Sequence, residues 1–86
     1  MNLCLDIENI IIEQIQDALV FISDPMNDET HLEAIVVSNE FKNLSLVDQH
    51  KRVMNLLKNS FNTNLHALKL KTYTLDKWKQ MNGGEI

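Results

Sequence analysis

Three histidines and one cysteine are the residues of this chain best suited to bind a metal ion: His31, His50, His66 and Cys4. A neutral imidazole binds metal through one ring nitrogen, whereas a single cysteine cannot form a cysteine-only cluster or zinc site. Taken alone, a histidine at the start of a strand more often makes a structural hydrogen bond. His50 falls among apolar residues at helical spacing, which favours a place in the core or at an interface. We interpret Cys4 as an incidental thiol.

Alternation and helical periodicity of apolar residues predict the elements that would position these side chains. β-Branched and aromatic residues predict three strands, at residues 19–23, 31–38 and 65–73. Asp24 and Pro25 end the first strand, and a polar loop follows. Two strands joined by so short a loop are expected to be antiparallel neighbours.

Helices complete the predicted pattern. Apolar residues at helical spacing in residues 7–18 predict the first helix. Residues 39–44 form a turn or a single helical turn, and Ser45 then caps a longer helix. The buried stripe expected on that helix is Val47, His50, Met54, Leu57 and Phe61. Thr74 is expected to cap a short final helix that stops near residues 83–84.

The order helix–strand–strand–helix–strand–helix predicts an α+β fold with a three-stranded mixed sheet and helices on one face. We expect a single domain over residues 1–86. A strand–helix–strand connection usually makes its two strands parallel, by a right-handed crossover. The second and third strands should therefore begin at the same edge of the sheet. His31 opens one and His66 lies at the start of the other, so the topology brings these two histidines to one region.

Charge is distributed unevenly along the chain. The net charge is −4, but residues 1–41 hold nine acids and no Lys or Arg, whereas residues 42–86 hold all eight basic residues. One interpretation is two solvated faces of different sign. The other is a basic surface for an acidic partner protein or a nucleic acid. The candidate residues of that surface are Lys51, Arg52, Lys69, Lys71 and Lys77.

Two segments of the chain together resemble the BolA family. Residues 36–57 read VVSNEFKNLSLVDQHKRVMNLL, and residues 66–78 read HALKLKTYTLDKW. Family members typically combine a VVS strand, an F-x-G-L-S turn and an R-H-R helix with a later H-A-L-x-x-K-T-Y-T strand and a tryptophan. The resemblance covers about residues 31–80 and implies the type II KH-like BolA fold.

The resemblance also implies a non-enzymatic adaptor for iron–sulfur cluster assembly or trafficking. In the family, a histidine of the H-A-L segment binds a 2Fe–2S cluster shared with a monothiol glutaredoxin, and His66 matches it. The other ligand, a Cys or His, comes from the loop between the first two strands or its exit, where His31 is the matching residue. The partner's cysteine and a bound glutathione would complete the cluster, so no cofactor is expected in the isolated chain. We expect a monomer alone and a heterodimer with the glutaredoxin.

A DNA-binding transcriptional regulator is the alternative function. Lysines alternate with Tyr73 and Trp78 near the C-terminus, a pattern found in nucleic-acid-binding proteins, although Trp78 is also explained as a core residue. The chain lacks the Gly-x-x-Gly clamp of KH domains, and its net charge disfavours phosphate, so we expect weak or no nucleic-acid binding. Two departures from the family pattern affect this reasoning. Gln49 replaces an arginine of the basic triplet, and Asn43 replaces the glycine of the turn.

Catalytic motifs such as a P-loop, a Ser–His–Asp arrangement or paired cysteines are absent from the sequence, so we expect no enzymatic activity. One cysteine allows no intramolecular disulfide, which fits a reducing compartment such as the cytoplasm. No apolar run has the length of a membrane span, and the acidic N-terminal region argues against a signal or transit peptide.

Overall fold

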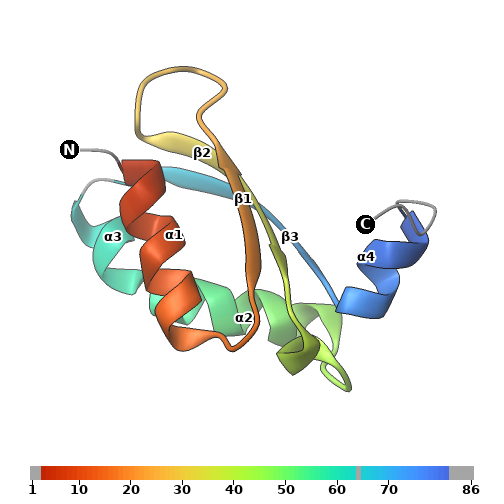
Figure 1. The fold of residues 1–86 in the computed structure, drawn as a ribbon. Coiled ribbons are helices and arrows are strands. Elements are labelled where there is room, and N and C mark those ends of the chain that lie inside the picture. The colour runs from red at the N-terminus through yellow and green to blue at the C-terminus, as the bar shows by residue number, and fades with distance from the viewer. Residues whose placement is uncertain (1–2, 64, 82–86) are drawn as a thin grey trace.

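The computed structural model describes residues 3–63 and 65–81. Figure 1 shows the chain as a small sheet with helices packed against it. Its elements in order are α1 (Leu3–Gln14), β1 (Leu19–Ser23), β2 (His31–Val37), the 3₁₀ helix η1 (Asn39–Phe41), α2 (Leu46–Leu56), α3 (Lys58–Thr63), β3 (Ala67–Tyr73) and α4 (Leu75–Met81). In these ranges, no helix combines the length and apolar character needed to cross a membrane.

The three strands form one mixed sheet in the order β1-β2-β3, as the sequence predicts. β1 and β2 are antiparallel, with Phe21 opposite Ile35, and β2 and β3 are parallel, with His31 opposite Ala67. The bounds of β1 match the prediction. β2 ends one residue early, and β3 begins at Ala67, so Leu65 and His66 precede it. The predicted parallel pair is therefore confirmed, with His66 directly before its strand.

The hydrophobic core lies between the sheet and the helices α1, α2 and α3. Among the apolar residues at helical spacing that predict the first helix, Ile7, Ile11 and Ile15 are buried, although α1 runs from Leu3 to Gln14 and ends before Ile15. They pack into one cluster with residues of β2, η1, α2 and the segment before β3, namely Leu32, Val36, Phe41, Val53, Leu57 and Leu65. Each fully buried side chain of this size contributes roughly 1.5–3 kcal/mol relative to an exposed one. This cluster fixes α1, α2 and α3 on one face of the sheet.

The predicted buried stripe of α2 is wrong in phase. Val47 is 63% exposed and His50 and Met54 are half-buried, whereas Gln49 and Val53 face the core. Ser45 caps the helix as predicted, by accepting from the backbone N–H of Asp48. A polar side chain nonetheless occupies the inward position of the next turn, so apolar spacing alone selects the wrong face. Leu57 is buried as expected, but it ends α2, and Phe61 belongs to the separate helix α3.

The last helix lies on the opposite side of the sheet from the core helices (Figure 1). Thr74 caps it as predicted, because its hydroxyl accepts from the backbone N–H of Lys77. The Trp78 ring stacks on Phe21 at a centroid distance of 5.4 Å and lies 5.7 Å from the Tyr73 ring. Trp78 therefore pins α4 to the sheet as predicted, but it is half-buried on the face opposite the hydrophobic core and is not a core residue. The prediction of helices on one face holds for α1, α2 and α3, and not for α4. The predicted helix end near residues 83–84 lies outside the described residues.

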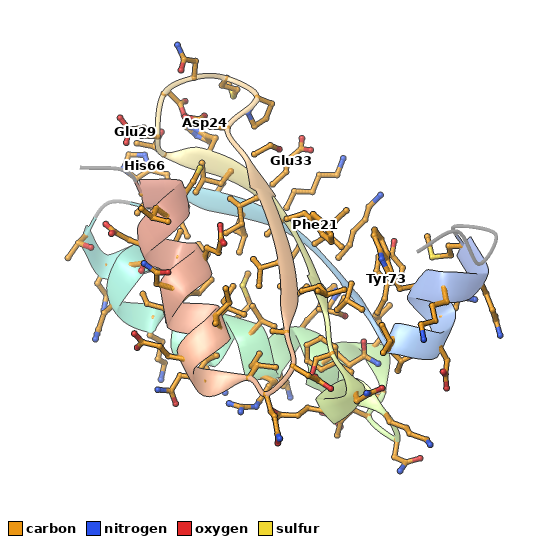
Figure 2. The ribbon with its side chains drawn as sticks, viewed as in Figure 1. Phe21, Asp24, Glu29, Glu33, His66 and Tyr73 are labelled. Atoms are coloured by element: carbon orange, nitrogen blue, oxygen red, sulfur yellow. The ribbon has the colours of Figure 1, made fainter. Side chains whose placement is uncertain are left out.

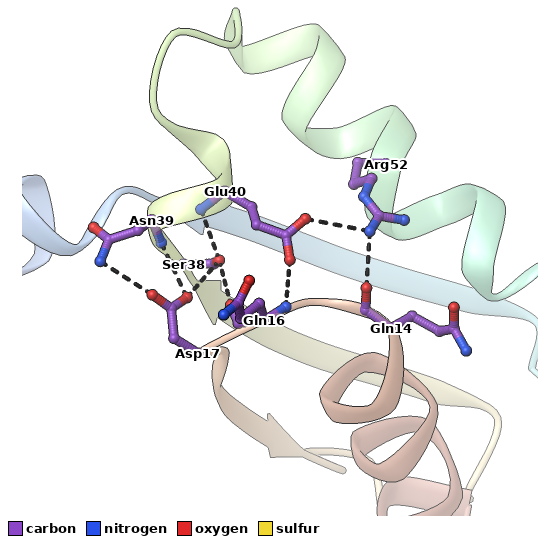
Figure 3. A network of polar contacts seen from close by, with 7 residues as sticks. All are labelled: Gln14, Gln16, Asp17, Ser38, Asn39, Glu40 and Arg52. Atoms are coloured by element: carbon purple, nitrogen blue, oxygen red, sulfur yellow. Dashed lines mark hydrogen bonds and ion pairs between the residues drawn. The ribbon is translucent and has the colours of Figure 1, made fainter.

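A polar network joins the end of α1, the end of β2 and α2 (Figure 3). Its members are Gln14, Gln16, Asp17, Ser38, Asn39, Glu40 and Arg52. The buried Ser38 hydroxyl lies 2.9 Å from both the Gln16 carbonyl and the Asp17 carboxylate, and it accepts from the Glu40 backbone N–H. Arg52 donates to the Gln14 carbonyl and to Glu40. These contacts hold the turns at the end of the sheet that lies far from the histidine pair.

Candidate metal centre

His31 and His66 lie side by side at one edge of the sheet. Their ring centroids are 5.9 Å apart and the ring planes are nearly perpendicular, at 89°. The parallel register accounts for this closeness, because His31 pairs with Ala67 and His66 is the residue just before it. Both residues are exposed. The predicted approach of the two histidines is therefore present in the structure, whereas their role as ligands stays a prediction.

The backbone of Thr30 ties the two histidine segments together. Its carbonyl accepts from the backbone N–H of His66 at 2.8 Å and from that of Ala67 at 3.1 Å. Since Thr30 directly precedes His31, one peptide unit of the loop positions the start of β3. The separation of the two imidazoles is thus set by backbone contacts as well as by strand register. Figure 2 shows His66 at the same end of the molecule as the loop residues Asp24 and Glu29.

Asp28 lies against His31. One carboxylate oxygen is 2.8 Å from His31 Nδ1, and the other accepts from the backbone N–H groups of Thr30 and His31. The backbone N–H of Thr30 is the largest cause of a pKa well below the usual value for the Asp28 carboxyl, followed by the backbone N–H and the ring of His31. Asp28 is therefore an ionised acceptor beside the imidazole at neutral pH.

The loop that carries Asp28 is itself held by Asp24. The Asp24 carboxylate accepts from the backbone N–H groups of Asp28 and Glu29, at 3.2 and 2.9 Å. Asn27 and Glu29 have positive φ angles of 55° and 57°, so the chain turns sharply at both positions. Burial, and then the nearby carboxylates of Asp24 and Glu29, raise the pKa of the Cys4 thiol. Cys4 accordingly lies near this loop as a thiol and not as a thiolate.

The two imidazoles at this edge suit a metal centre that is shared with a second protein, because they do not form a complete set of ligands by themselves. Two imidazoles bound to one tetrahedral ion at about 2.0–2.1 Å would have their ring centres roughly 5 Å apart, close to the separation of the His31 and His66 rings. In the part of the chain that the structure describes, no group of three or more His, Cys, Asp or Glu side chains could hold a metal. Any further ligands from these residue types would come from elsewhere.

The residues predicted for a basic partner surface are divided between faces. Lys69 and Lys71 are exposed on the open face of the sheet, where they line a shallow cavity of about 210 Å³ with Phe21 and Ile35. Lys51 is exposed on α2, and Lys77 on α4. Arg52 is engaged in the polar network at the far end of the sheet. Lys69 and Lys71 therefore share one surface, which also includes Glu33.

The model of the BolA-like protein family matches residues 10–77, which is most of the chain. The chain belongs to the BolA-like family. It is 39% identical over 54 residues to the "DNA-binding transcriptional regulator BolA" of Haemophilus influenzae, covering 63% of this chain and 52% of that protein. The chain thus spans about half the length of the first curated relatives that it matches.

Solved structures of BolA proteins have the same fold. BolA1 from Arabidopsis thaliana superposes with a TM-score of 0.82 at 27% identity, covering 90% of this chain and 96% of that chain. A BolA homologue from Coxiella burnetii gives a TM-score of 0.75 at 30% identity, covering 87% and 94%. The BolA-like fold predicted from the two sequence motifs is therefore confirmed.

The two departures from the BolA pattern have structural explanations. Asn43, at the position of the family's turn glycine, has a φ angle of 72°. Asparagine tolerates this left-handed region better than most residues, so the turn is retained without glycine. Gln49, in place of an arginine, is only 8% exposed and accepts from the Thr72 hydroxyl at 2.8 Å. Its amide nitrogen donates to the carbonyl of Leu44 at 3.1 Å.

Asp28, Thr30 and Gln49 are the site and core residues that sequence reasoning missed. For Asp28 a local signal exists, because an Asp two or three residues before a strand can accept from the following backbone N–H groups. The sequence D-E-T-H at residues 28–31 has this form. For Gln49 the available signal is an odd one, a polar residue one turn after the helix cap and between two apolar residues of the same helix face.

Proposed function

We propose that this BolA-like protein is a non-enzymatic adaptor that binds a 2Fe–2S cluster jointly with a monothiol glutaredoxin. The observation that carries the proposal is the pair His31 and His66, held at 5.9 Å on one exposed edge of the sheet. Imidazole is an established ligand of iron–sulfur clusters, as the two histidines on one iron of Rieske centres show. An exposed pair can face a second protein, whereas a buried pair could not.

The two proteins would divide the ligands between them. His31 and His66 would supply two imidazoles, and the cysteine of the glutaredoxin and its glutathione would supply thiolates. The bound cluster would contribute electron transfer or iron–sulfur transfer to a client protein. The residues of this chain bind and orient it, and the Thr30 carbonyl fixes the spacing between the two imidazole-bearing segments. The open face with Lys69 and Lys71 is the part of the basic half best placed to contact an acidic partner surface.

The test is co-expression of this chain with a monothiol glutaredoxin, followed by visible absorption and circular dichroism of the purified complex. We expect a mixed-ligand spectrum for the wild type. His66→Ala should remove it and leave a spectrum of the glutaredoxin type. His31→Ala should weaken the mixed cluster without preventing docking of the apo proteins.

His50→Ala is the matched control, because it removes a half-buried imidazole of α2 that is not part of the pair. It should leave the mixed spectrum unchanged in the folded fraction. Retention of the wild-type spectrum and affinity by both His31→Ala and His66→Ala would contradict the proposal.

DNA binding is the second candidate function. It is favoured by the name of the Haemophilus influenzae relative and by the exposed Lys69, Lys71 and Phe21 on the open sheet face. Stacking on aromatic rings and phosphate contacts by lysines are the usual means of such binding. With a net charge of −4, we expect a Kd of micromolar or poorer at physiological salt. Fluorescence anisotropy with labelled duplexes over a salt series decides this, and tight sequence-selective binding that survives near-physiological salt would reverse the ranking of the two functions.

A further inference from the structure

The carboxylate of Asp28 faces the ring of His31 from the loop that precedes β2. We propose that Asp28 is the positioning residue of the metal centre: it selects the His31 tautomer protonated on Nδ1 and so makes Nε2 the metal-binding nitrogen. The inference rests on the proposed function, since it takes His31 to be a ligand.

Hydrogen-bond chemistry determines the tautomer. His31 Nδ1 lies 2.8 Å from the Asp28 carboxylate oxygen Oδ2. A carboxylate has no proton to donate, so this bond exists only when Nδ1 carries the proton. Neutral imidazole has one N–H, which leaves the lone pair on Nε2. A metal-binding histidine typically donates its other ring N–H to a carboxylate or carbonyl in this manner.

The second neighbour of the same nitrogen does not select a tautomer. The Thr30 hydroxyl lies 2.9 Å from His31 Nδ1. A hydroxyl donates or accepts as required, so it would satisfy either form of the ring. Asp28 is therefore the only one of these two contacts that distinguishes between the nitrogens. Replacing Thr30 by valine would remove the hydroxyl and keep the Asp28 carboxylate. That variant is therefore a control in which the contact that does not select a tautomer is removed.

Asp28 is held in place independently of the ring. Its oxygen Oδ1 accepts from the backbone N–H groups of Thr30 and His31, at 3.0 and 3.1 Å. Its own backbone N–H donates to the Asp24 carboxylate. The Thr30 carbonyl, in turn, holds the backbone N–H of His66. One short segment therefore orients the His31 ring and spaces the second histidine beside it.

Asparagine at position 28 tests the tautomer without dismantling the loop. An Asn side chain has the size of Asp and keeps an oxygen that can accept from the two backbone N–H groups. Its NH₂ group would then face His31 Nδ1 as a donor and favour the opposite tautomer. Glu29→Gln is the matched control for charge, because it removes one negative charge from the same loop and keeps a side-chain oxygen that can accept from the backbone N–H of Leu3.

The first measurement uses the apo protein labelled with ¹⁵N-histidine, at a pH where the ring is neutral. Long-range ¹H–¹⁵N spectra distinguish protonated from unprotonated ring nitrogens. We expect the Nδ1-protonated form of His31 in the wild type, in Thr30→Val and in Glu29→Gln, and a shift toward the Nε2-protonated form in Asp28→Asn. An Nε2-protonated His31 in the wild type, or an unchanged tautomer in Asp28→Asn, would overturn the inference.

The second measurement uses the co-expressed complex with the glutaredoxin. We expect Asp28→Asn to weaken mixed-cluster binding by about 10–100-fold, as loss of a carboxylate behind a ligating histidine does, while Glu29→Gln binds within a few-fold of wild type. If Asp28→Asn keeps the wild-type affinity and His31→Ala loses it, the positioning role is wrong and the proposed function stands. If both His31→Ala and His66→Ala keep the cluster, the proposed function fails and this inference fails with it.

Discussion

Replacing Gln49 by leucine should destabilise the fold by removing the hydrogen bonds of one buried side chain. The Gln49 side chain accepts from the Thr72 hydroxyl at 2.8 Å and donates to the carbonyl of Leu44 at 3.1 Å. Thr72 is 4% exposed, so water cannot easily replace the lost acceptor. A stranded buried donor costs about 1–3 kcal/mol, and loss of the bond to the carbonyl about 0.5–1.5 kcal/mol. We expect Gln49→Leu to lower the free energy of unfolding by about 2–3 kcal/mol, a large part of the roughly 5–15 kcal/mol typical of whole domains.

The second substitution separates the hydrogen bond from general packing. Thr72→Val leaves the Gln49 Oε1 atom without its partner and should cost about 1–2 kcal/mol. In the double variant both partners of this hydrogen bond are absent, so neither is left buried without a partner. It should therefore be about 1–2 kcal/mol more stable than the sum of the two single losses predicts. Urea unfolding followed by far-UV circular dichroism gives all four free energies, provided that the m-values agree.

The control is Gln80→Leu, which changes an exposed glutamine of α4. It should alter the free energy of unfolding by no more than about 0.5 kcal/mol. Losses at Gln49 and Thr72 that add within about 0.5 kcal/mol would show that the two side chains are not coupled. The argument that a buried amide determines which face of α2 turns inward would then be wrong.

Four further predictions test other parts of the structure. Asn43→Ala should lower the free energy of unfolding by about 1 kcal/mol, because φ is 72° there, whereas Asn43→Gly should not, by urea titration. Phe21→Ala removes the ring stacked on Trp78, so the single-tryptophan fluorescence should shift to the red and stability should fall by about 0.5–1.5 kcal/mol. Burial and nearby carboxylates raise the pKa of the Cys4 thiol, so alkylation at mildly alkaline pH should be slower in the folded protein than in urea. The Asp28 pKa is lowered by folding, so its stabilisation should be present above its unfolded pKa of about 3.9 and lost as the pH falls further; urea midpoints of wild type and Asp28→Asn should converge in acid.

The sequence predicted those features that depend on strand order and on apolar alternation. Residues 19–23 form a strand with the predicted bounds, and the crossover between β2 and β3 brings His31 to His66. Both results follow from period-two patterning and from the handedness rule, which need no knowledge of side-chain contacts. The closeness of the two histidines therefore follows from the sequence alone.

The features that the sequence did not predict depend on contacts between distant or irregular segments. The inward face of α2 is set by Gln49, whose acceptor role requires Thr72 from β3. Arg52 was placed on a basic surface, but its guanidinium bonds to Gln14 and Glu40 from other elements. Such pairings arise only after the elements pack. Periodicity counts both residues simply as polar, so it cannot distinguish a buried amide or an engaged arginine from a solvated one.

The charge around the histidine pair bears on which kind of ligand this edge can hold. The loop next to it carries the carboxylates of Asp24, Asp28 and Glu29, so the edge disfavours nucleic-acid phosphate, and DNA contacts would have to lie farther along β3 at Lys69 and Lys71. In the proposed cluster, neutral imidazoles would suit such a place better than thiolates, because each would replace an anionic ligand and so reduce the negative charge of the cluster beside these three acids. Histidine ligation of this kind also raises the reduction potential of a 2Fe–2S centre. An acidic loop beside two neutral imidazole ligands is therefore electrostatically reasonable. The two candidate functions would use separate surfaces of the same sheet.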